Sequence, residues 1–221
     1  MDALDAGQER WPERGPLADF PRGAAAGDCL HRILEQFPFT PEEAELSKVV
    51  APADLILAEL RRAGLDPELT ESVLEGLQRV LQTPLGGALG SLTLAELGPD
   101  QRLHELSFDL PVQRVRTSDL VAAFRCEPSA RFGAGYADQL EALAVNSRGF
   151  LTGSIDRVFR DPYSKRWWVL DWKSNWIGER RSEASDVRCG PVHYHKASMD
   201  EQMVHHHYPL QAHLYLVALH R

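Results

Sequence analysis

The feature that most constrains this chain is a pair of strand-like segments joined by a short turn. Residues 149–160 and 166–174 are rich in β-branched and aromatic side chains, and the turn sequence DPYS separates them. With a four-residue loop, the antiparallel register places Asp156 opposite Asp171, with Cβ atoms roughly 4.5–5.5 Å apart. A register shifted by one residue would separate the two side chains. The sequence therefore predicts a β-hairpin that brings two carboxylates together.

A lysine lies close to these carboxylates. Asp171 and Lys173 are two residues apart on a strand, so their side chains share one face, and Leu170 and Trp172 point to the opposite face. Two carboxylates held close together repel each other unless a proton or a cation lies between them. Mg²⁺ suits such a place, because it binds one or two carboxylates together with waters and phosphate oxygens, and a nearby lysine can orient a water. On spacing alone, a surface hairpin with a cross-strand salt bridge is the commoner alternative.

Periodicity predicts the remaining elements. Helices are indicated at 24–37, at 53–63, from Asp66 to Leu81 and from Tyr208 to the end of the chain. A strand-like alternation begins at Gln101 and stops at Pro111. Residues 179–207 are polar with poor periodicity, and we expect a long loop there. Residues 1–19 are rich in proline, glycine and charge, and we expect a linker or disordered lead-in.

Composition excludes several classes of protein. The formal net charge is −8, so the chain is not a polycation that grips nucleic acid by net charge. It holds no run of 18 apolar residues, and its start lacks the basic and apolar regions of a signal peptide. The 3 cysteines form no CxxC pair and no Gly-x-x-x-x-Gly-Lys run exists, which argues against a zinc ribbon, an iron–sulfur cluster and a P-loop. We expect a reduced, soluble, cytoplasmic protein with no membrane partner.

The charge is unevenly distributed. Residues 148–181 hold 8 basic and 4 acidic side chains, a net charge of +4, which leaves −12 for the rest of the chain. A basic segment around an acidic pocket suits binding to a phosphate backbone without reading its sequence. The acidic remainder predicts that the isolated domain binds DNA weakly.

The hairpin sequence also resembles a known family. Residues 149–160 (GFLTGSIDRVFR) and 170–178 (LDWKSNWIG) closely resemble the nuclease domain of RecB, a PD-(D/E)xK-type domain of the RecBCD helicase–nuclease. Matching stretches of that family follow the same order at Phe20–His31, His104–Pro111 and Tyr208–Arg221. The resemblance covers roughly Phe20 to Arg221. Small departures are Arg157, where an apolar residue is usual, and Trp172, where tyrosine is usual.

The resemblance implies a role for each matching residue. The implied set consists of the metal-binding residues His31, Asp156, Asp171 and Trp172, the catalytic residues Asp171 and Lys173, the DNA-positioning residues Gln211 and Tyr215, and the supporting residue Glu105. Trp172 would bind the metal through its backbone carbonyl, and the metal would be Mg²⁺. Gln211 and Tyr215 lie one turn apart on a helix face, where they would hold the DNA strand near the scissile phosphate.

The resemblance also implies a fold and an activity. The fold would be α/β, with a mixed central β-sheet flanked by helices, in a nuclease domain at 20–221 that is truncated at its C-terminus. The activity would be Mg²⁺-dependent exonucleolytic hydrolysis of DNA, in double-strand-break repair by recombination and in degradation of linear DNA. Expected partners are linear DNA whose single strand is fed from a duplex end, a helicase region, RecC- and RecD-like subunits, and a RecA-type recombinase.

Two other hypotheses remain open. The chain could be a non-catalytic module that handles DNA ends or docks a recombinase, although such a module would be expected to have lost the metal-binding residues. It could also be a free-standing nuclease. The run His205–His207, with His193 and His195, could bind a metal, but a solvated, flexible histidine-rich loop is the favoured interpretation.

Overall fold

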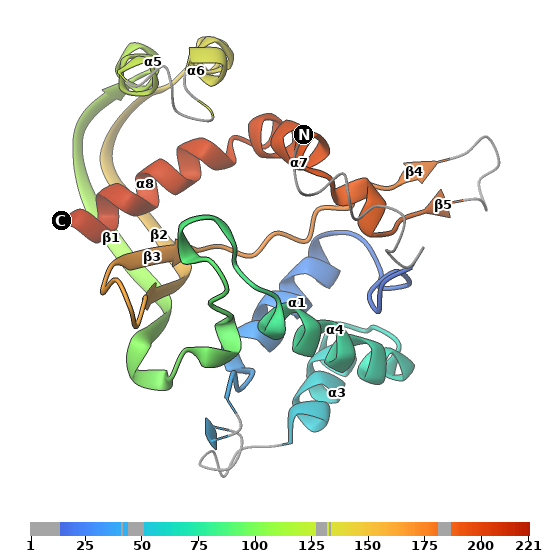
Figure 1. Cartoon of the computed structure of the whole chain (residues 1–221). Coiled ribbons are helices and arrows are strands. Elements are labelled where there is room, and N and C mark those ends of the chain that lie inside the picture. The colour runs from blue at the N-terminus through green and yellow to red at the C-terminus, as the bar shows by residue number, and fades with distance from the viewer. Residues whose placement is uncertain (1–13, 41, 44–50, 127–131, 133, 181–186) are drawn as a thin grey trace. The chain divides into compact units, whose positions relative to one another are not determined.

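The computed structural model of the chain describes residues 14–40, 42–43, 51–126, 132, 134–180 and 187–221. The chain divides into two compact units. Unit 1 comprises Met1–Glu105 and Asp156–Met199, and unit 2 comprises Leu106–Ile155 and Asp200–Arg221. The described residues contain both helices and β-sheets, which confirms the predicted α/β fold class (Figure 1).

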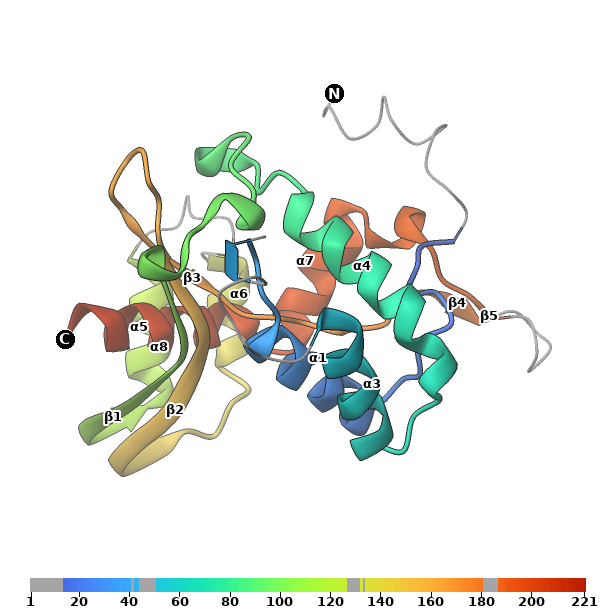
Figure 2. The same cartoon turned by 90° about the horizontal axis from the view of Figure 1, so that it is seen from below.

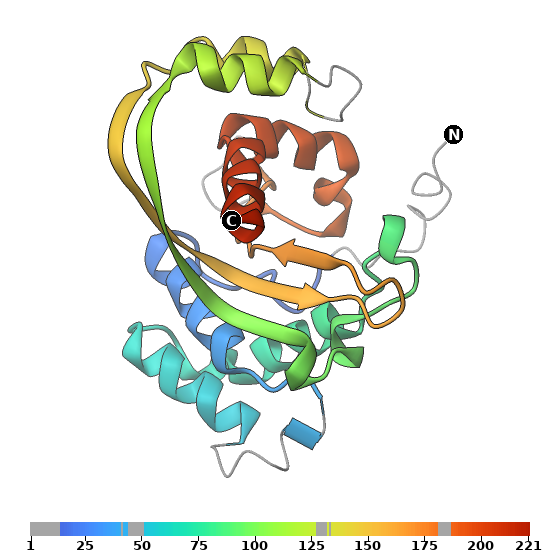
Figure 3. The ribbon, with the colours of Figure 1, turned by 90° about the vertical axis from the view of Figure 1, so that its left-hand side faces the viewer.

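The main sheet has three strands in the order β1-β2-β3. Its strands are β1 (Arg102–Arg116), β2 (Asn146–Arg160) and β3 (Trp167–Leu170), and β1 and β2 run beside each other as long curved ribbons (Figure 3). β2 and β3 are antiparallel, with Arg157 opposite Leu170 and Arg160 opposite Trp167. These four pairs have the register predicted from the sequence. The pairing ends at Arg157 and Leu170, one residue before Asp156 and Asp171, and the charge of Asp171 acts on Asp156. A second, two-stranded sheet pairs β4 (Glu179–Arg180) with β5 (Val187–Arg188).

The turn between β2 and β3 explains why this register forms. The Asp161 carboxylate accepts hydrogen bonds from the backbone N–H groups of Tyr163, at 2.9 Å, and Ser164, at 3.2 Å. Asp161 and Arg166 close the loop through a 2.9 Å backbone hydrogen bond, and Lys165 takes the left-handed conformation with φ of 60°. An aspartate that bonds the backbone two residues ahead is a common turn device. The turn chemistry therefore fixes the pairing of β3 with residues 157–160 of β2.

Two strand boundaries differ from the prediction. β1 continues through Pro111 to Arg116, because β1 is the edge strand of its sheet, where a residue without an N–H group is tolerated. β3 ends at Leu170 instead of reaching residue 174. Past Leu170, the backbone N–H of Trp172 donates to the side chain of Asp156 and not to a backbone carbonyl. The ladder of backbone hydrogen bonds therefore stops at Leu170, and a bond from the backbone of Trp172 to the Asp156 side chain takes its place.

Helices α1 (Ala24–Gln36), α3 (Pro52–Arg62) and α4 (Thr70–Gln82) pack together in unit 1, as Figure 2 shows. Their positions confirm the three helices predicted from periodicity. Asp66 caps the 3₁₀ turn Pro67–Leu69 that leads into α4. Buried side chains from the three helices and from β2 form one core, which includes Ile33, Ile56, Leu60, Leu77 and Phe159. Other 3₁₀ turns lie at Gly87–Leu89, Leu94–Glu96, Pro99–Gln101 and Pro191–Tyr194.

Packing in unit 1 extends into the predicted lead-in. Leu17 is partly buried against the core, and its side chain lies so close to Gly76 on α4 that a Cβ atom there would be 2.9 Å from Leu17 Cγ. The segment before residue 20 therefore contributes to the fold from at least Leu17. Residues 1–13 of the predicted lead-in lie outside the described residues.

Unit 2 has its own small core. Helices α5 (Thr117–Arg125) and α6 (Ala134–Leu140) lie side by side beyond β1 and β2, and Val121, Tyr136, Ala137 and Leu140 are buried between them and their neighbours (Figure 1). Helix α8 (Tyr208–His220) confirms the predicted last helix. The Tyr215 ring on α8 contacts the Phe108 ring on β1 edge to face, with 6.0 Å between ring centres.

The loop predicted at 179–207 is wrong in part, because it contains helix α7 (Lys196–His205). No residue of α7 is buried, so this helix has no apolar stripe for periodicity to detect. The histidine run is not one flexible loop either. His205 ends α7, whereas His207 precedes α8 in the left-handed conformation, with its Nδ1 atom 3.0 Å from the hydroxyl of Tyr136.

A buried arginine connects α1 to β2. Arg157 has an exposed fraction of 0%, and its Nη2 atom donates to the Leu34 carbonyl at 2.9 Å and to His104 Nδ1 at 2.7 Å. Its guanidinium carbon lies 3.8 Å from the centre of the Phe39 ring. Burial lowers the pKa of Arg157 to about 9, and burial together with the charge of Arg157 lowers the pKa of His104 to about 4. The arginine that departs from the family pattern thus ties the helix of His31 to the strand of Asp156.

The pKa of His104 predicts a loss of stability in mild acid. As pH falls, an unfolded His104 takes up a proton near the ordinary histidine pKa of 6.5, whereas the native side chain, with its pKa of about 4, stays neutral until the pH approaches that value. The contribution of neutral His104 to the free energy of unfolding is therefore complete above pH 6.5 and is lost as pH falls toward 4. Between pH 7 and 5 it amounts to at most about 2 kcal/mol. Urea titrations should give a shallower pH dependence for His104→Gln than for the wild type, and identical slopes would contradict this prediction.

Candidate active site

The end of the β2–β3 hairpin brings three of the predicted metal-binding residues together. Asp156 projects from β2 with its side chain 14% exposed, and its Oδ2 atom lies 3.5 Å from Nδ1 of His31 on α1. The backbone N–H of Trp172 donates to the same Oδ2 atom at 2.7 Å. Trp172 packs its side chain against the unit 1 core, as the alternation along the strand predicted. One carboxylate oxygen is thus placed between a helix and a strand end.

The surroundings of Asp156 disfavour its negative charge. Burial raises the pKa of the Asp156 carboxyl, and the nearby charges of Asp171 and Glu105 raise it further. The N–H of Trp172 and the charge of His31 act in the opposite direction. A bound divalent cation would relieve this repulsion. The electrostatics of the hairpin end are therefore compatible with a bound cation.

Lys173 lies against the other carboxylate. Its Nζ atom forms an ion pair with Oδ2 of Asp171, and the two side chains are 29% and 17% exposed. Both residues lie past the end of β3 at Leu170, and the pair does not cross the hairpin. An ion pair between these two residues is also what the salt-bridge alternative expects of an Asp-x-Lys sequence. The lysine is thereby held beside the carboxylates, where it can reach a substrate phosphate or an attacking water.

Glu105 lies on β1 with an unusual backbone. Its φ of 46° is in the left-handed region, which a non-glycine residue in a strand rarely adopts. The charge of Glu105 acts on both Asp156 and Arg157, so the side chain belongs to the same electrostatic neighbourhood. Strained backbone of this kind is frequent at functional sites. Its supporting role remains a prediction.

Gln211 and Tyr215 form a separate pair. Nε2 of Gln211 donates to the Tyr215 hydroxyl at 2.7 Å, as their spacing on one helix face predicted. Both lie in unit 2, whereas all the other candidate residues lie in unit 1. Their role in positioning DNA remains a prediction.

The donor set fits a hard divalent cation. Two carboxylates and a backbone carbonyl are the ligands that Mg²⁺ accepts, and the imidazole of His31 completes the set. Among the described residues, no three His, Cys, Asp or Glu side chains are gathered closely enough to form a complete metal site, in the hairpin or near the histidine run. The residues of the hairpin therefore offer suitable donors that an ion would draw together.

A close approach between α1 and the segment after Lys173 positions this site. A Cβ atom added to Gly27, one turn before His31, would lie 2.9 Å from Oγ of Ser174. Glycine at this place lets the strand end that carries Lys173 lie directly against the helix that carries His31.

We expect Gly27→Ala to lower DNA cleavage without lowering stability. Alanine favours the helix by about 1 kcal/mol over glycine, but its methyl group would push Ser174 and the neighbouring Lys173 away from α1. Displacements of about 1 Å at a reacting centre cost up to about 10²-fold in rate. Cleavage kinetics and thermal melting should be compared with those of the double variant Gly27→Ala/Ser174→Gly, in which the clash is removed. Failure of the second substitution to restore activity would contradict this account.

A sequence profile of the PD-(D/E)XK nuclease superfamily matches residues 7–221. The chain therefore belongs to the PD-(D/E)XK nuclease superfamily, whose nucleases generally depend on a divalent metal ion. Within that superfamily it is similar to the RecB subunits of RecBCD enzymes. It is 36% identical to RecB of Mycobacterium tuberculosis and 34% identical to RecB of Mycolicibacterium smegmatis, in each case over 93% of this chain and 19% of the relative. It is 32% identical to RecB of Escherichia coli over 91% of this chain and 15% of the relative.

The chain thus spans about a fifth of the length of these relatives or less. These comparisons confirm the resemblance inferred from the hairpin sequence, both to the PD-(D/E)XK superfamily and to RecB subunits. A search of the helices in the described part of the chain finds none long and apolar enough to cross a membrane.

Proposed function

We propose that the chain is a Mg²⁺-dependent exodeoxyribonuclease that hydrolyses phosphodiester bonds in linear DNA. The observation that carries this proposal is the group of charged side chains where the β2–β3 pairing ends: Asp156 lies 3.5 Å from His31 and is acted on by the charge of Asp171, which is paired with Lys173. Membership of a nuclease superfamily supports the reaction class. The alternative, a non-catalytic docking module, has no need of two carboxylates and a lysine placed together.

Each residue of the hairpin has a role in this mechanism. His31, Asp156, Asp171 and the backbone carbonyl of Trp172 would hold Mg²⁺, which when bound supplies a Lewis acid for the phosphate oxygens and lowers the pKa of a bound water. Lys173 orients the attacking water and balances the charge that builds on the phosphate. The water oxygen forms a bond to phosphorus as the bond to the 3′ oxygen breaks, which leaves a 5′-phosphate and a 3′-hydroxyl end.

The likeness to RecB subunits supports a wider setting for this activity. In that setting the chain acts beside a helicase region and RecC- and RecD-like subunits, which unwind a duplex end and feed it a single strand. A RecA-type recombinase is the further partner, and the processes are recombinational repair of double-strand breaks and degradation of linear DNA. The net charge of −8 favours delivery of DNA by such partners over tight binding by the chain alone.

Cleavage of end-labelled, linear single-stranded DNA tests the proposed reaction. We expect cutting with Mg²⁺, no cutting with EDTA, and no cutting with Ca²⁺, whose looser coordination binds the site without arranging it for catalysis. Cutting that persists in EDTA would exclude a metal-dependent mechanism. If the chain does not cut DNA and calorimetry shows no binding of Mg²⁺, the result favours the docking module.

A further inference from the structure

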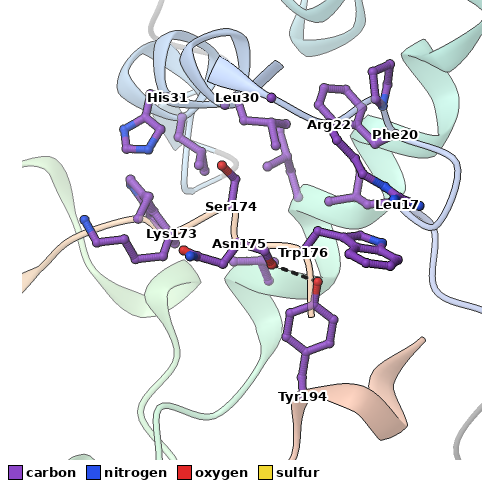
Figure 4. Close-up of a pocket in the computed structure, with 17 residues that line it drawn as sticks. Leu17, Phe20, Arg22, Leu30, His31, Lys173, Ser174, Asn175, Trp176 and Tyr194 are labelled. Carbon is purple, nitrogen blue, oxygen red and sulfur yellow. Dashed lines mark hydrogen bonds between the residues drawn. The ribbon is translucent and has the colours of Figure 1, made fainter. Parts of the chain in front are cut away.

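A cavity of about 270 Å³ opens beside the candidate active site, within unit 1 (Figure 4). Its apolar wall includes Leu17, Phe20, Leu30 and Trp176, and His31 and Lys173 also line it. Figure 4 shows His31 and Lys173 at one end and Arg22 and Trp176 at the other, with Leu30 and Ser174 between them. A group bound in this cavity would therefore lie next to a phosphate held at the hairpin end.

The far end of the cavity combines an aromatic surface with a positive charge. The guanidinium carbon of Arg22 lies 3.6 Å from the centre of the Trp176 ring. The guanidinium covers one face of the indole, and Arg22 itself is exposed at the surface. A ligand that suits this end has a flat apolar face and belongs to an anionic chain.

The segment that carries Trp176 is held in place from two sides. The hydroxyl of Tyr194 donates to the backbone carbonyl of Asn175 at 2.9 Å, as Figure 4 shows. Ser174 lies against Gly27 of α1. The cavity wall is therefore preformed, and binding into it does not require the ordering of a loop.

We propose that this cavity binds one nucleobase of the DNA strand, the base adjacent to the phosphate that is cleaved. The inference rests on the proposed function and names the substrate subsite of that same site. A nucleobase has the planar, largely apolar face that Trp176 and the neighbouring leucines accommodate, and polar edges for Ser174 and Asn175. Its own phosphate lies toward Lys173, and the next phosphate toward Arg22.

Binding in the cavity sets a requirement on the substrate. A base can enter only after it leaves its stack and its pairing partner, so the nucleotide at the cleavage position must be single-stranded or frayed. Stacking accepts every base, since each has a π face, and cleavage is therefore tolerant of sequence. The proposal therefore predicts cleavage of an unwound strand and little cleavage of an intact duplex.

An abasic scan tests the subsite on the unaltered chain. Labelled single strands each carry one abasic residue at a different position and are cut in the presence of Mg²⁺. We expect cleavage to be roughly 10- to 100-fold slower at the phosphate a fixed offset from the missing base, and unchanged elsewhere. Anisotropy in Ca²⁺ provides a second readout, in which a short strand lacking the recognised base binds correspondingly more weakly.

Trp176→Ala supplies the matched variant, with Trp167→Ala as its control. Trp167 is 52% exposed on β3 and does not line the cavity. We expect Trp176→Ala to bind intact strands roughly 10-fold more weakly and to lose its sensitivity to the abasic position, whereas Trp167→Ala behaves as the wild type.

The possible results distinguish failure of the proposed nucleobase subsite from failure of the proposed nuclease activity. If the wild type cuts intact strands in Mg²⁺ but every abasic strand is cut and bound equally well, the subsite is wrong and the nuclease assignment stands. Preserved abasic sensitivity in a folded Trp176→Ala variant would also overturn the subsite. If the wild type does not cut any strand in Mg²⁺, the proposed function fails and the subsite fails with it.

Discussion

Replacing Asp171 by alanine is expected to abolish Mg²⁺-dependent DNA cleavage while leaving the fold nearly intact. Asp171 lies just past the end of β3, and its charge acts on Asp156. The substitution removes one of the two carboxylates that would hold the metal. A bound metal supplies several kcal/mol of transition-state stabilisation, so the loss should be at least about 10³-fold in rate. Cleavage kinetics, with thermal melting as the measure of folding, check this result.

The exposed Asp109 on β1 offers a matched control for Asp171. Asp109→Ala removes the same group from the surface of unit 2, and we expect wild-type cleavage. Calorimetry should show weaker binding of Mg²⁺ to Asp171→Ala and unchanged binding to Asp109→Ala. Wild-type cleavage by Asp171→Ala would contradict the assignment of the active site.

Replacing Lys173 by alanine should separate catalysis from metal binding. Lys173 forms an ion pair with Asp171, so its removal takes away a positive charge that competes with a bound cation for that carboxylate. We therefore expect Mg²⁺ to bind at least as tightly as in the wild type, while cleavage falls by about 10²- to 10⁴-fold. Lys173→Arg should not restore the rate, because the planar guanidinium cannot place a compact charge at the same point.

The control for Lys173 is Lys165→Ala in the turn of the same hairpin, where the Nζ atom bonds the Pro162 carbonyl. This variant should cut DNA at close to the wild-type rate. A parallel loss of metal binding and cleavage in Lys173→Ala would mean that the lysine builds the site and does not act in the reaction.

The hairpin register could be predicted from sequence because it depends on local turn chemistry. Asp161 bonds the backbone within its own turn, so four residues determine which residues of β2 and β3 face each other. The contact between Gln211 and Tyr215 was predictable for the same reason, since helix spacing fixes neighbours on a face. His31 is different, because only the packing of α1 against β2 brings it to Asp156.

Features that depend on distant contacts could not be predicted. Arg157 is buried between an α1 carbonyl, His104 and the Phe39 ring, and its sequence neighbours give no sign of these partners. Helix α7 has no buried face, and β1 passes through Pro111 only because it is an edge strand. The cavity joins Arg22 to Trp176, two residues far apart in sequence. The contacts of Arg157 and Arg22 are tertiary, and the absence of a buried face on α7 and the edge position of β1 likewise leave no local pattern in the sequence.

The contact between a divalent ion at the hairpin and the scissile phosphate is the central claim, and a phosphorothioate substrate tests it most directly. Sulfur in place of one non-bridging oxygen binds the hard Mg²⁺ poorly but accepts a softer ion such as Mn²⁺. We predict that one sulfur diastereomer at the cleaved linkage is cut slowly with Mg²⁺ and at close to the normal rate with Mn²⁺. Equal slowing of both diastereomers with either ion would contradict a metal held against the phosphate by Asp156 and Asp171.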